Sequence, residues 1–443
     1  AGTAVTTATN NVAVGSNSLK TITVGSNNTA IGRNAGVDTQ GDSNVFVGRG
    51  SGYYATASYN TFVGNRAANG VSGGSGGIYN TALGFEALER FRNGSYNTAL
   101  GTDTGEYIAD GSYITLVGAY AGRYATGSNN TFVGSEAGKG GTTSAPYSSG
   151  QNNTALGFQA LTGFTTAERM VSIGYESMHN VTTGVDSIAI GYQAAYYNSG
   201  SESVSIGSYA GMSSGATNNV SIGFRAGGSS GGSNVAIGSS AMRYLPPGSE
   251  NVAVGNTAGS YLIGTQTTIV GSQAGRFATG SYNTFMGYRA GYGGTTSAPF
   301  SSGTSNVAVG YQALAGFTTG YGNVAVGNNS LDAVTEGFYN IGIGPAAGGS
   351  ITSGDHNIAM GYATFDAATT TGYTIAIGYM ALSAYTHGEN AYNIAMGIQT
   401  AYLKTSGKYN TYIGGYKSAT ADLTGEYNAY FGSYTNQYGT ATS

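Results

Sequence analysis

The sequence predicts an all-β fold, a parallel β-solenoid (β-roll) of about 25 coils with 16–17 residues per coil. A five-residue word (Asn, a β-branched residue, any residue, an apolar residue, Gly) returns along the chain, as in NVAVG ending at Gly15, NTALG at Gly84 and NTYIG at Gly414. Most copies follow one another at 16 or 17 residues, which is too short for a propeller blade. Charged residues are 8% of the chain, against about 25% in ordinary globular domains, and this disfavours a set of ordinary compact domains.

Each copy of the word predicts one short strand followed by a turn. Counting from the Gly as zero, position −1 is apolar in all 25 copies, −3 is Val, Ile or Thr in 24, and −4 is Asn in 19. Residues two apart share a face of a strand, and we expect −1 and −3 to point into the coil. An apolar residue at +6 or +7 predicts a second, weaker strand that closes the coil. The Gly predicts a turn with positive φ, and the Asn predicts a ladder of side-chain amides along the axis. Position +3 is Ala, Ser or Thr in every copy except one, which has Lys417, and this predicts a crowded site.

The repeats run from the word at Gly15 to the word at Gly432 and predict one continuous β-solenoid repeat domain over 1–443. Longer intervals predict loop insertions at one corner of the coil, near 69–79, 138–152 and 291–305. The last two contain GGTTSAP(Y/F)SSG and belong to a duplication that aligns 118–174 with 271–327. Loops on rigid scaffolds often carry function, so Tyr147 and Phe300 at the tips are candidates for surface contact; neutral variation in loop length is the alternative.

The outer side of the predicted strands lacks charge. None of the 75 residues at −1, −2 and −3 is charged, and −2, on the face opposite −1, includes Phe46, Phe132 and Ile269. A strand that is apolar on both faces is normally buried on both. We therefore expect copies of the same chain to cover the −2 face in a closed cyclic assembly, with a monomer that tolerates an apolar stripe as the alternative. An Ile190→Asp change at −1 is expected to open the stack, because it would bury an unpaired charge.

The words NVAVGxxA, NTALGFQAL and SIAIGYQA resemble the head repeats of trimeric autotransporter adhesins and the shaft repeats of phage tail fibres. The resemblance implies a side-by-side homotrimer of β-rolls in a structural extracellular fibre that mediates adhesion or surface attachment, at a cell surface or on a virion. A phage tail-fibre shaft or receptor-binding fibre is the alternative. The implied partners are sister chains and a surface glycan or cell-surface receptor. The coils are longer than the shortest adhesin-head repeats, and the chain starts at Ala1 without Met, so we expect a removed leader or a segment of a longer protein.

Composition predicts neither catalysis nor a cofactor. A net charge of -4 excludes a basic footprint for nucleic acid, and no apolar run is long enough for a membrane span in this segment. We expect no metal site, because Cys is absent and His179, His356 and His387 lie in different coils. The sparse acids are interpreted as solvated corners, whereas a glycan-processing fibre enzyme would need two neighbouring carboxylates. A monomeric ice-binding solenoid would need an exposed Thr-x-Thr face and is disfavoured by the expected inward direction of −3.

Aromatic residues recur at two further stations of the repeat. Position +1 is Phe or Tyr in nine copies and −5 is Tyr in many others, so stacking of the coils predicts columns of rings. These rings either cap the edges of the core and fill gaps between chains, or form a ladder for sugars or hydrophobic surfaces. The possible surface contacts among them are Tyr175, Tyr192, Tyr288 and Tyr311.

Overall fold

The computed structural model describes residues 7–142, 147–198, 200–212, 215–228, 231–244, 248–297 and 300–435. The chain divides into two compact units, unit 1 (Ala1–Asn219) and unit 2 (Val220–Ser443). Each unit is a parallel β-solenoid, as the sequence predicted. The residues described contain no helix, and therefore none that could cross a membrane. A single continuous domain over 1–443 stays a prediction.

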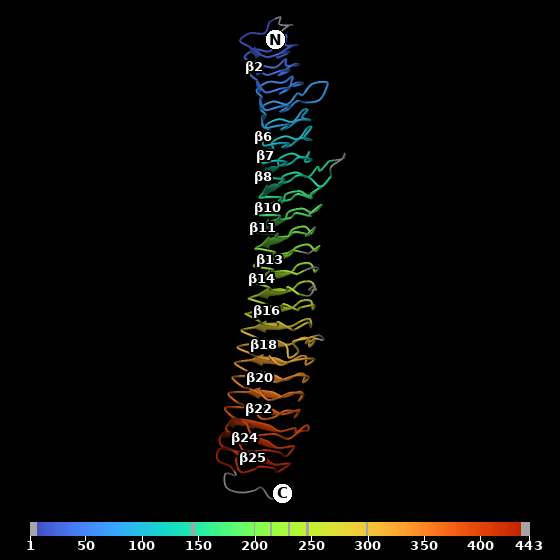
Figure 1. Cartoon of the computed structure of the whole chain (residues 1–443). Coiled ribbons are helices and arrows are strands. Elements are labelled where there is room, and N and C mark those ends of the chain that lie inside the picture. Colours follow the sequence, from blue (N-terminus) through green and yellow to red (C-terminus); the bar gives the residue numbers. More distant parts are fainter. Residues whose placement is uncertain are drawn as a thin grey trace. The chain divides into compact units, whose positions relative to one another are not determined.

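Every coil contributes one strand to a single parallel sheet along its unit, and the strands follow one side of the coils (Figure 1). Unit 1 contains β1 (Val12–Val14), β2 (Thr29–Ile31), β3 (Val45–Val47), β4 (Thr61–Val63), β5 (Thr81–Leu83), β6 (Thr98–Leu100), β7 (Thr115–Val117), β8 (Thr131–Val133), β9 (Thr154–Leu156), β10 (Val171–Ile173), β11 (Ile188–Ile190) and β12 (Val204–Ile206). Unit 2 contains β13 (Val220–Ile222), β14 (Val235–Ile237), β15 (Val252–Val254), β16 (Thr268–Val270), β17 (Thr284–Met286), β18 (Val307–Val309), β19 (Val324–Val326), β20 (Ile341–Ile343), β21 (Ile358–Met360), β22 (Ile375–Ile377), β23 (Ile394–Ile398), β24 (Thr411–Tyr416) and β25 (Ala429–Phe431). Equivalent stations pair across neighbouring coils, as Val12 pairs with Thr29.

The strands turn to the core the face opposite to the one predicted. At −2, Phe46 and Phe62 are fully buried, whereas at −1 Leu83 is 45% and Ile190 is 37% exposed. The inward assignment of −1 and −3 is therefore wrong. A three-residue strand sends only its middle side chain inward. That side chain lies beside the small residue at +3, as Ser172 contacts Ser177, and beside the residue at +4, as Phe46 lies against Gly52. Because Ile190 lies on the outer face, Ile190→Asp would not bury a charge within unit 1, and its expected effect on the stack is withdrawn.

The predicted second strand is replaced by turns in the described residues. Non-glycine residues adopt positive φ at alternate stations of the turn, as Asn17 (φ +61°) and Leu19 (φ +46°) do, and this prevents an extended run. The turn still hydrogen-bonds to the next coil, since the Leu19 N–H donates to the Ala35 carbonyl at 3.0 Å. The apolar residues at +4 and +7 reach the core from this turn; Leu88 and Phe91 are fully buried.

The Asn ladder at −4 is confirmed. The Oδ1 of Asn28 accepts two hydrogen bonds from Asn44, one from its backbone N–H at 2.9 Å and one from its side-chain Nδ2 at 3.0 Å. The Nδ2 of Asn44 also donates to the carbonyl of Ala57 at 2.9 Å. Each amide therefore joins its own coil to both neighbours and satisfies buried backbone groups that the short strand leaves unpaired.

The exception at +3 is explained by a bulge in unit 2. Met396 pairs with Ile413 but Ile398 pairs with Tyr416, so β24 contains one more residue than β23 between these pairs. The extra residue shifts the stations by one, and Ser418 takes the buried place at +3 instead of Lys417.

The word Gly lets the coils approach each other. At Gly84 φ is +148°, and a Cβ there would lie 2.1 Å from the carbonyl oxygen of Gly101 in the next coil. Positive φ is confirmed at the word glycines with the exception of Gly414, and backbone contact adds a second requirement for glycine.

Two glycines in the third repeat differ in both requirements. Gly48 has φ +130° and a Cβ there would lie 2.3 Å from the Gly64 carbonyl oxygen, whereas at Gly50 (φ +67°) the nearest atom would lie at 3.8 Å. We expect Gly48→Ala to lower the free energy of unfolding by ~3 kcal/mol, the upper end of the range for backbone strain, and Gly50→Ala to lower it by about 1 kcal/mol. Denaturant unfolding and hydrogen exchange at β3 and β4 measure both losses; equal losses would contradict the special requirement for glycine at Gly48.

Candidate functional site

The insertion loops leave the coil at one shared station. Isolated parallel bridges pair Ala55 with Ser75 and Ala125 with Ser148 in unit 1, and Ala278 with Ser301 in unit 2. All three alanines lie at +7 of their coils, so the three insertions adjoin the same station of the repeat. Two of these loops, 69–79 and 138–152, belong to unit 1, and the coils between them have no insertion.

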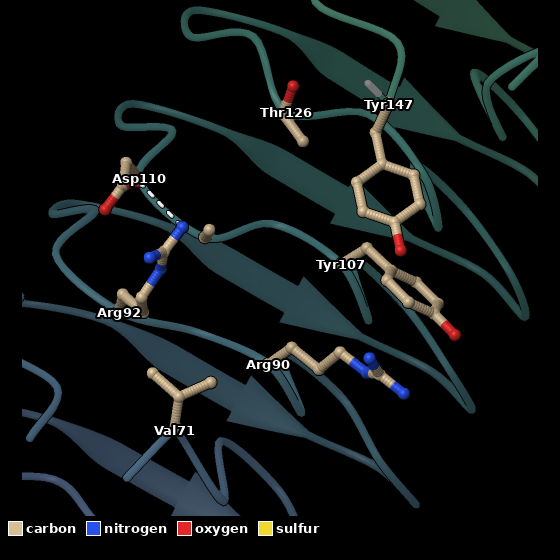
Figure 2. Close-up of a pocket in the computed structure, with 8 residues that line it drawn as sticks. Val71, Arg90, Arg92, Tyr107, Asp110, Thr126 and Tyr147 are labelled. Carbon is tan, nitrogen blue, oxygen red and sulfur yellow. Dashed lines mark ion pairs between the residues drawn. The ribbon is translucent and has the colours of Figure 1, made fainter. Parts of the chain in front are cut away.

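The space between these two loops is a cleft of about 550 Å³. Val71 from the first loop and Tyr147 from the second lie at its two ends, and the intervening coils form its floor (Figure 2). The residues that line it are Val71, Arg90, Arg92, Tyr107, Ala109, Asp110, Thr126 and Tyr147. A volume of this size falls within the range of small-molecule sites.

One wall of the cleft is a row of two rings and a guanidinium. The Tyr107 and Tyr147 ring centroids are 4.8 Å apart, and the Arg90 guanidinium carbon lies 4.5 Å from the Tyr107 centroid (Figure 2). Burial raises the pKa of Tyr107, and the neighbouring Glu106 carboxylate adds to this effect, so its hydroxyl is neutral at physiological pH. The wall can therefore offer an aromatic surface and a positive charge to the same ligand.

Arg92 and Asp110 lie across from that wall, with Nη2 and Oδ2 3.4 Å apart. Both side chains are exposed, and such a pair contributes little to stability. Asp110 Oδ1 also accepts a hydrogen bond from Asn93 Nδ2 at 3.0 Å. Donors and acceptors thus face the aromatic wall on side chains that are free to change partners.

The sequence predicted that the acids lie at solvated corners of the coils. Two acids deeper in these coils are buried instead. Glu89 and Glu106 are buried, and each pairs with an arginine: Glu89 with Arg66, and Glu106 Oε2 with Arg123 Nε at 2.6 Å. Burial raises the pKa of Glu89, and Arg66 opposes that shift. The partner of each acid lies in another coil, which a single repeat does not reveal.

The six sequence-predicted contact residues fall into separate groups. Tyr147 lines the cleft, whereas Phe300 packs on Tyr261 in unit 2 with centroids 4.6 Å apart, so both fold back on their coils. Tyr175 and Tyr192 stack at 5.2 Å in an exposed column at +1, and the predicted column is confirmed there. The remaining two, Tyr288 and Tyr311, also stack, at 5.5 Å.

Tyrosines at −5 form the other predicted columns. In unit 1, Tyr59, Tyr79, Tyr96 and Tyr113 stack with neighbouring centroids 5.0–5.2 Å apart. His356 belongs to such a column in unit 2, where it stacks on Tyr373 at 4.9 Å, and His179 stacks on Tyr196 at 5.0 Å. Two of the three histidines therefore act as flat rings in ladders. Within the described residues, no three His, Asp or Glu side chains are grouped so that they could hold a metal ion.

Sequence reasoning missed Arg90, Arg92 and Asp110. The available signal was the spacing of the insertions: two loops at the same corner with uninserted coils between them must enclose a recess. The residues of those coils that line it occupy +6 to +9, where the sequence predicted a second strand from aromatic residues and gave charged residues no role.

Comparisons with known proteins yield no relative. No protein-family model matches the chain, and no significant match is found among curated proteins or solved structures.

Proposed function

We propose that this chain is a structural, non-enzymatic extracellular fibre protein that mediates adhesion or surface attachment as a side-by-side homotrimer. The observation that carries the proposal is the outer face of the sheet, where the apolar side chains at −1 are exposed or half-buried and never fully buried. The most exposed are Val14, Ile31, Leu83, Leu100, Leu156 and Ile190 in unit 1, and Met286, Ile343, Met396, Ile413 and Phe431 in unit 2.

An exposed face of this kind supports self-association. Large contiguous apolar patches are rare on monomers and mark interaction sites. The face contains no charged residue, so it offers an outside partner no electrostatic feature to recognise. A second and third copy of the same chain present the same spacing of apolar side chains, and closed cyclic assembly covers all three faces. The sequence predicted that sister chains cover the outer face of the sheet and assigned −2 to that face. In the structure the outer face is formed by −1 and −3.

Mass measurement in solution tests the assembly. We expect three times the chain mass of 44.6 kDa for the wild type, and one chain mass for Leu156→Asp/Ile190→Asp, because the charges would have to be desolvated in the interface. Val24→Asp is the matched control, since Val24 is exposed but lies outside the strands. A wild type of one chain mass would overturn the homotrimer.

Ice binding by a monomer is the alternative that the exposed face of the sheet favours. Thr at −3 is exposed over six consecutive coils of unit 1, so burial of −3 does not oppose ice binding. The column beside it is Val or Leu instead of a second Thr, as in Val63 and Leu83. Thermal hysteresis by the wild type, together with a mass of one chain, would replace the fibre proposal with this one.

Glycan processing is disfavoured by the ion pairs of the acids. Glu89 and Glu106 each have an arginine partner, which favours the charged carboxylate, whereas a general acid for glycoside cleavage must hold a proton. Burial nevertheless raises the pKa of Glu89, so Glu89 is the acid to test. Cleavage of a surface polysaccharide that is lost in Glu89→Gln would establish the enzyme.

Immunogold labelling of intact cells and of virions separates a cell-surface location from a tail fibre.

A further inference from the structure

We propose that the cleft of unit 1 binds a carboxylate-bearing sugar residue, such as a uronic or sialic acid. The proposal deepens the adhesive function proposed above, because it names the class of surface ligand. Three features of the cleft carry the argument: an unpaired arginine, a two-ring wall, and a loosely held ion pair across from it.

Arg90 is the anion-binding group. Among the residues described, no carboxylate lies within 4.0 Å of its guanidinium, although its charge acts on Glu89 at longer range and lowers the pKa of that carboxyl. The Arg90 side chain packs on the Tyr107 ring, with the guanidinium carbon 4.5 Å from the ring centroid. Stacking fixes the plane of the guanidinium and leaves the N–H donors along its edge available to a ligand. A planar guanidinium matches a carboxylate with two parallel hydrogen bonds. A cationic ligand is disfavoured by the same charge.

The wall beside Arg90 selects a ring-shaped ligand. Tyr107 and Tyr147 present neighbouring rings, and both contact Tyr124, whose ring centroid lies 5.0 Å from that of Tyr107 and 6.1 Å from that of Tyr147. The rings are therefore held by packing in the coils. Amphipathic tyrosine rings can contact the C–H face of a sugar while their hydroxyls remain hydrogen-bonded. A simple anion such as phosphate would use Arg90 but leave this wall without a contact.

Arg92, Asp110 and Thr126 supply the polar contacts for hydroxyl groups. The Arg92–Asp110 pair is exposed, and opening it costs little. Asp110 accepts and Arg92 donates, which suits neighbouring sugar hydroxyls that do both. The cleft volume of about 550 Å³ accommodates one or two sugar residues.

Titration calorimetry with the full-length protein tests the site, with methyl β-glucuronide and methyl sialoside as probes and methyl β-glucoside as the neutral match. We expect both acidic glycosides to bind at least ~10-fold more tightly than the neutral one, and Arg90→Gln to remove that difference, because the charged bidentate contact is lost. Arg243→Gln is the control, since Arg243 also stacks on a tyrosine, at 4.6 Å, but in unit 2. It should leave affinity unchanged.

The outcomes separate the site from the fibre. Equal affinity for acidic and neutral glycosides, or no loss in Arg90→Gln, overturns the site. Inorganic sulfate that competes as strongly as the sugar would reduce it to a simple anion site and overturn the sugar assignment. Because the cleft lies within one chain, Leu156→Asp/Ile190→Asp should keep sugar binding. A wild type that binds the sugar but does not assemble would contradict the homotrimer and leave the sugar site standing. A wild type that assembles but does not bind the sugar would contradict the sugar site and leave the homotrimer standing.

Discussion

Asp422→Ala is expected to lower the free energy of unfolding of the C-terminal coils of unit 2 by ~3–5 kcal/mol, because it leaves a buried ammonium group without its partner. Lys404 and Asp422 are 0% and 2% exposed, with Nζ and Oδ1 3.5 Å apart. Lys404 Nζ also donates to the Gly425 carbonyl at 2.8 Å, and Asp422 accepts the Tyr412 hydroxyl. Burial lowers the pKa of Lys404, and Asp422 opposes that shift. Without Asp422, the carboxylate of Glu426 is left to oppose the burial effect.

The double variant Lys404→Met/Asp422→Leu is the control, since it removes both charges and keeps apolar volume. It should recover part of the stability lost in Asp422→Ala, because the buried ammonium is gone but the Tyr412 hydroxyl and the Gly425 N–H still lose Asp422 as their acceptor. Hydrogen exchange at β23 to β25 measures the local loss. The deficit of Asp422→Ala should also shrink as pH rises from the depressed folded-state pKa of Lys404 to its ordinary value near 10.4, because the unfolded state binds more protons in that window. A loss below about 1 kcal/mol, or a deficit that grows over that window, would mean that the ammonium group reaches water.

This buried pair lay beyond sequence reasoning for a physical reason. Lys404 occupies +7 of its coil, where Phe91 and Phe164 fill the core in others. A lysine there is stable only because the next coil, shifted by its bulge, places Asp422 opposite it. Burial of a charge is thus decided by the neighbouring coil and not by the station in its own repeat.

The strands themselves could be predicted and their direction could not. β5 covers Thr81–Leu83, the three residues before Gly84 that the word specifies. The apolar pattern of −1, −2 and −3 gives both faces the same character, so it contains no information on which face points inward. Residue size would have been the better guide: −2 ranges from Ala82 to Phe62, and such variation requires compensation elsewhere in a packed core.

Station +4 provides that compensation. Phe46 at −2 is followed by Gly52 at +4, where a Cβ would lie 2.5 Å from the Phe46 ring. Ala155 at −2 is instead followed by Leu161, and both are fully buried. Leu161 has φ +54° and Gly52 +57°, so a leucine can adopt the backbone conformation of Gly52. A bulky −2 residue and a bulky +4 residue therefore exclude each other.

A double-mutant cycle on this pair should show strong coupling. Phe46→Ala alone is expected to cost ~3–5 kcal/mol through the cavity it leaves, and Gly52→Leu alone ~1–3 kcal/mol through overpacking against the ring. The combined variant recreates the arrangement of Ala155 and Leu161, so it should be at least ~1 kcal/mol more stable than Phe46→Ala. Denaturant unfolding of the four proteins measures the coupling. Additive losses would show that the two stations do not share space, and that glycine at +4 is required by the backbone instead.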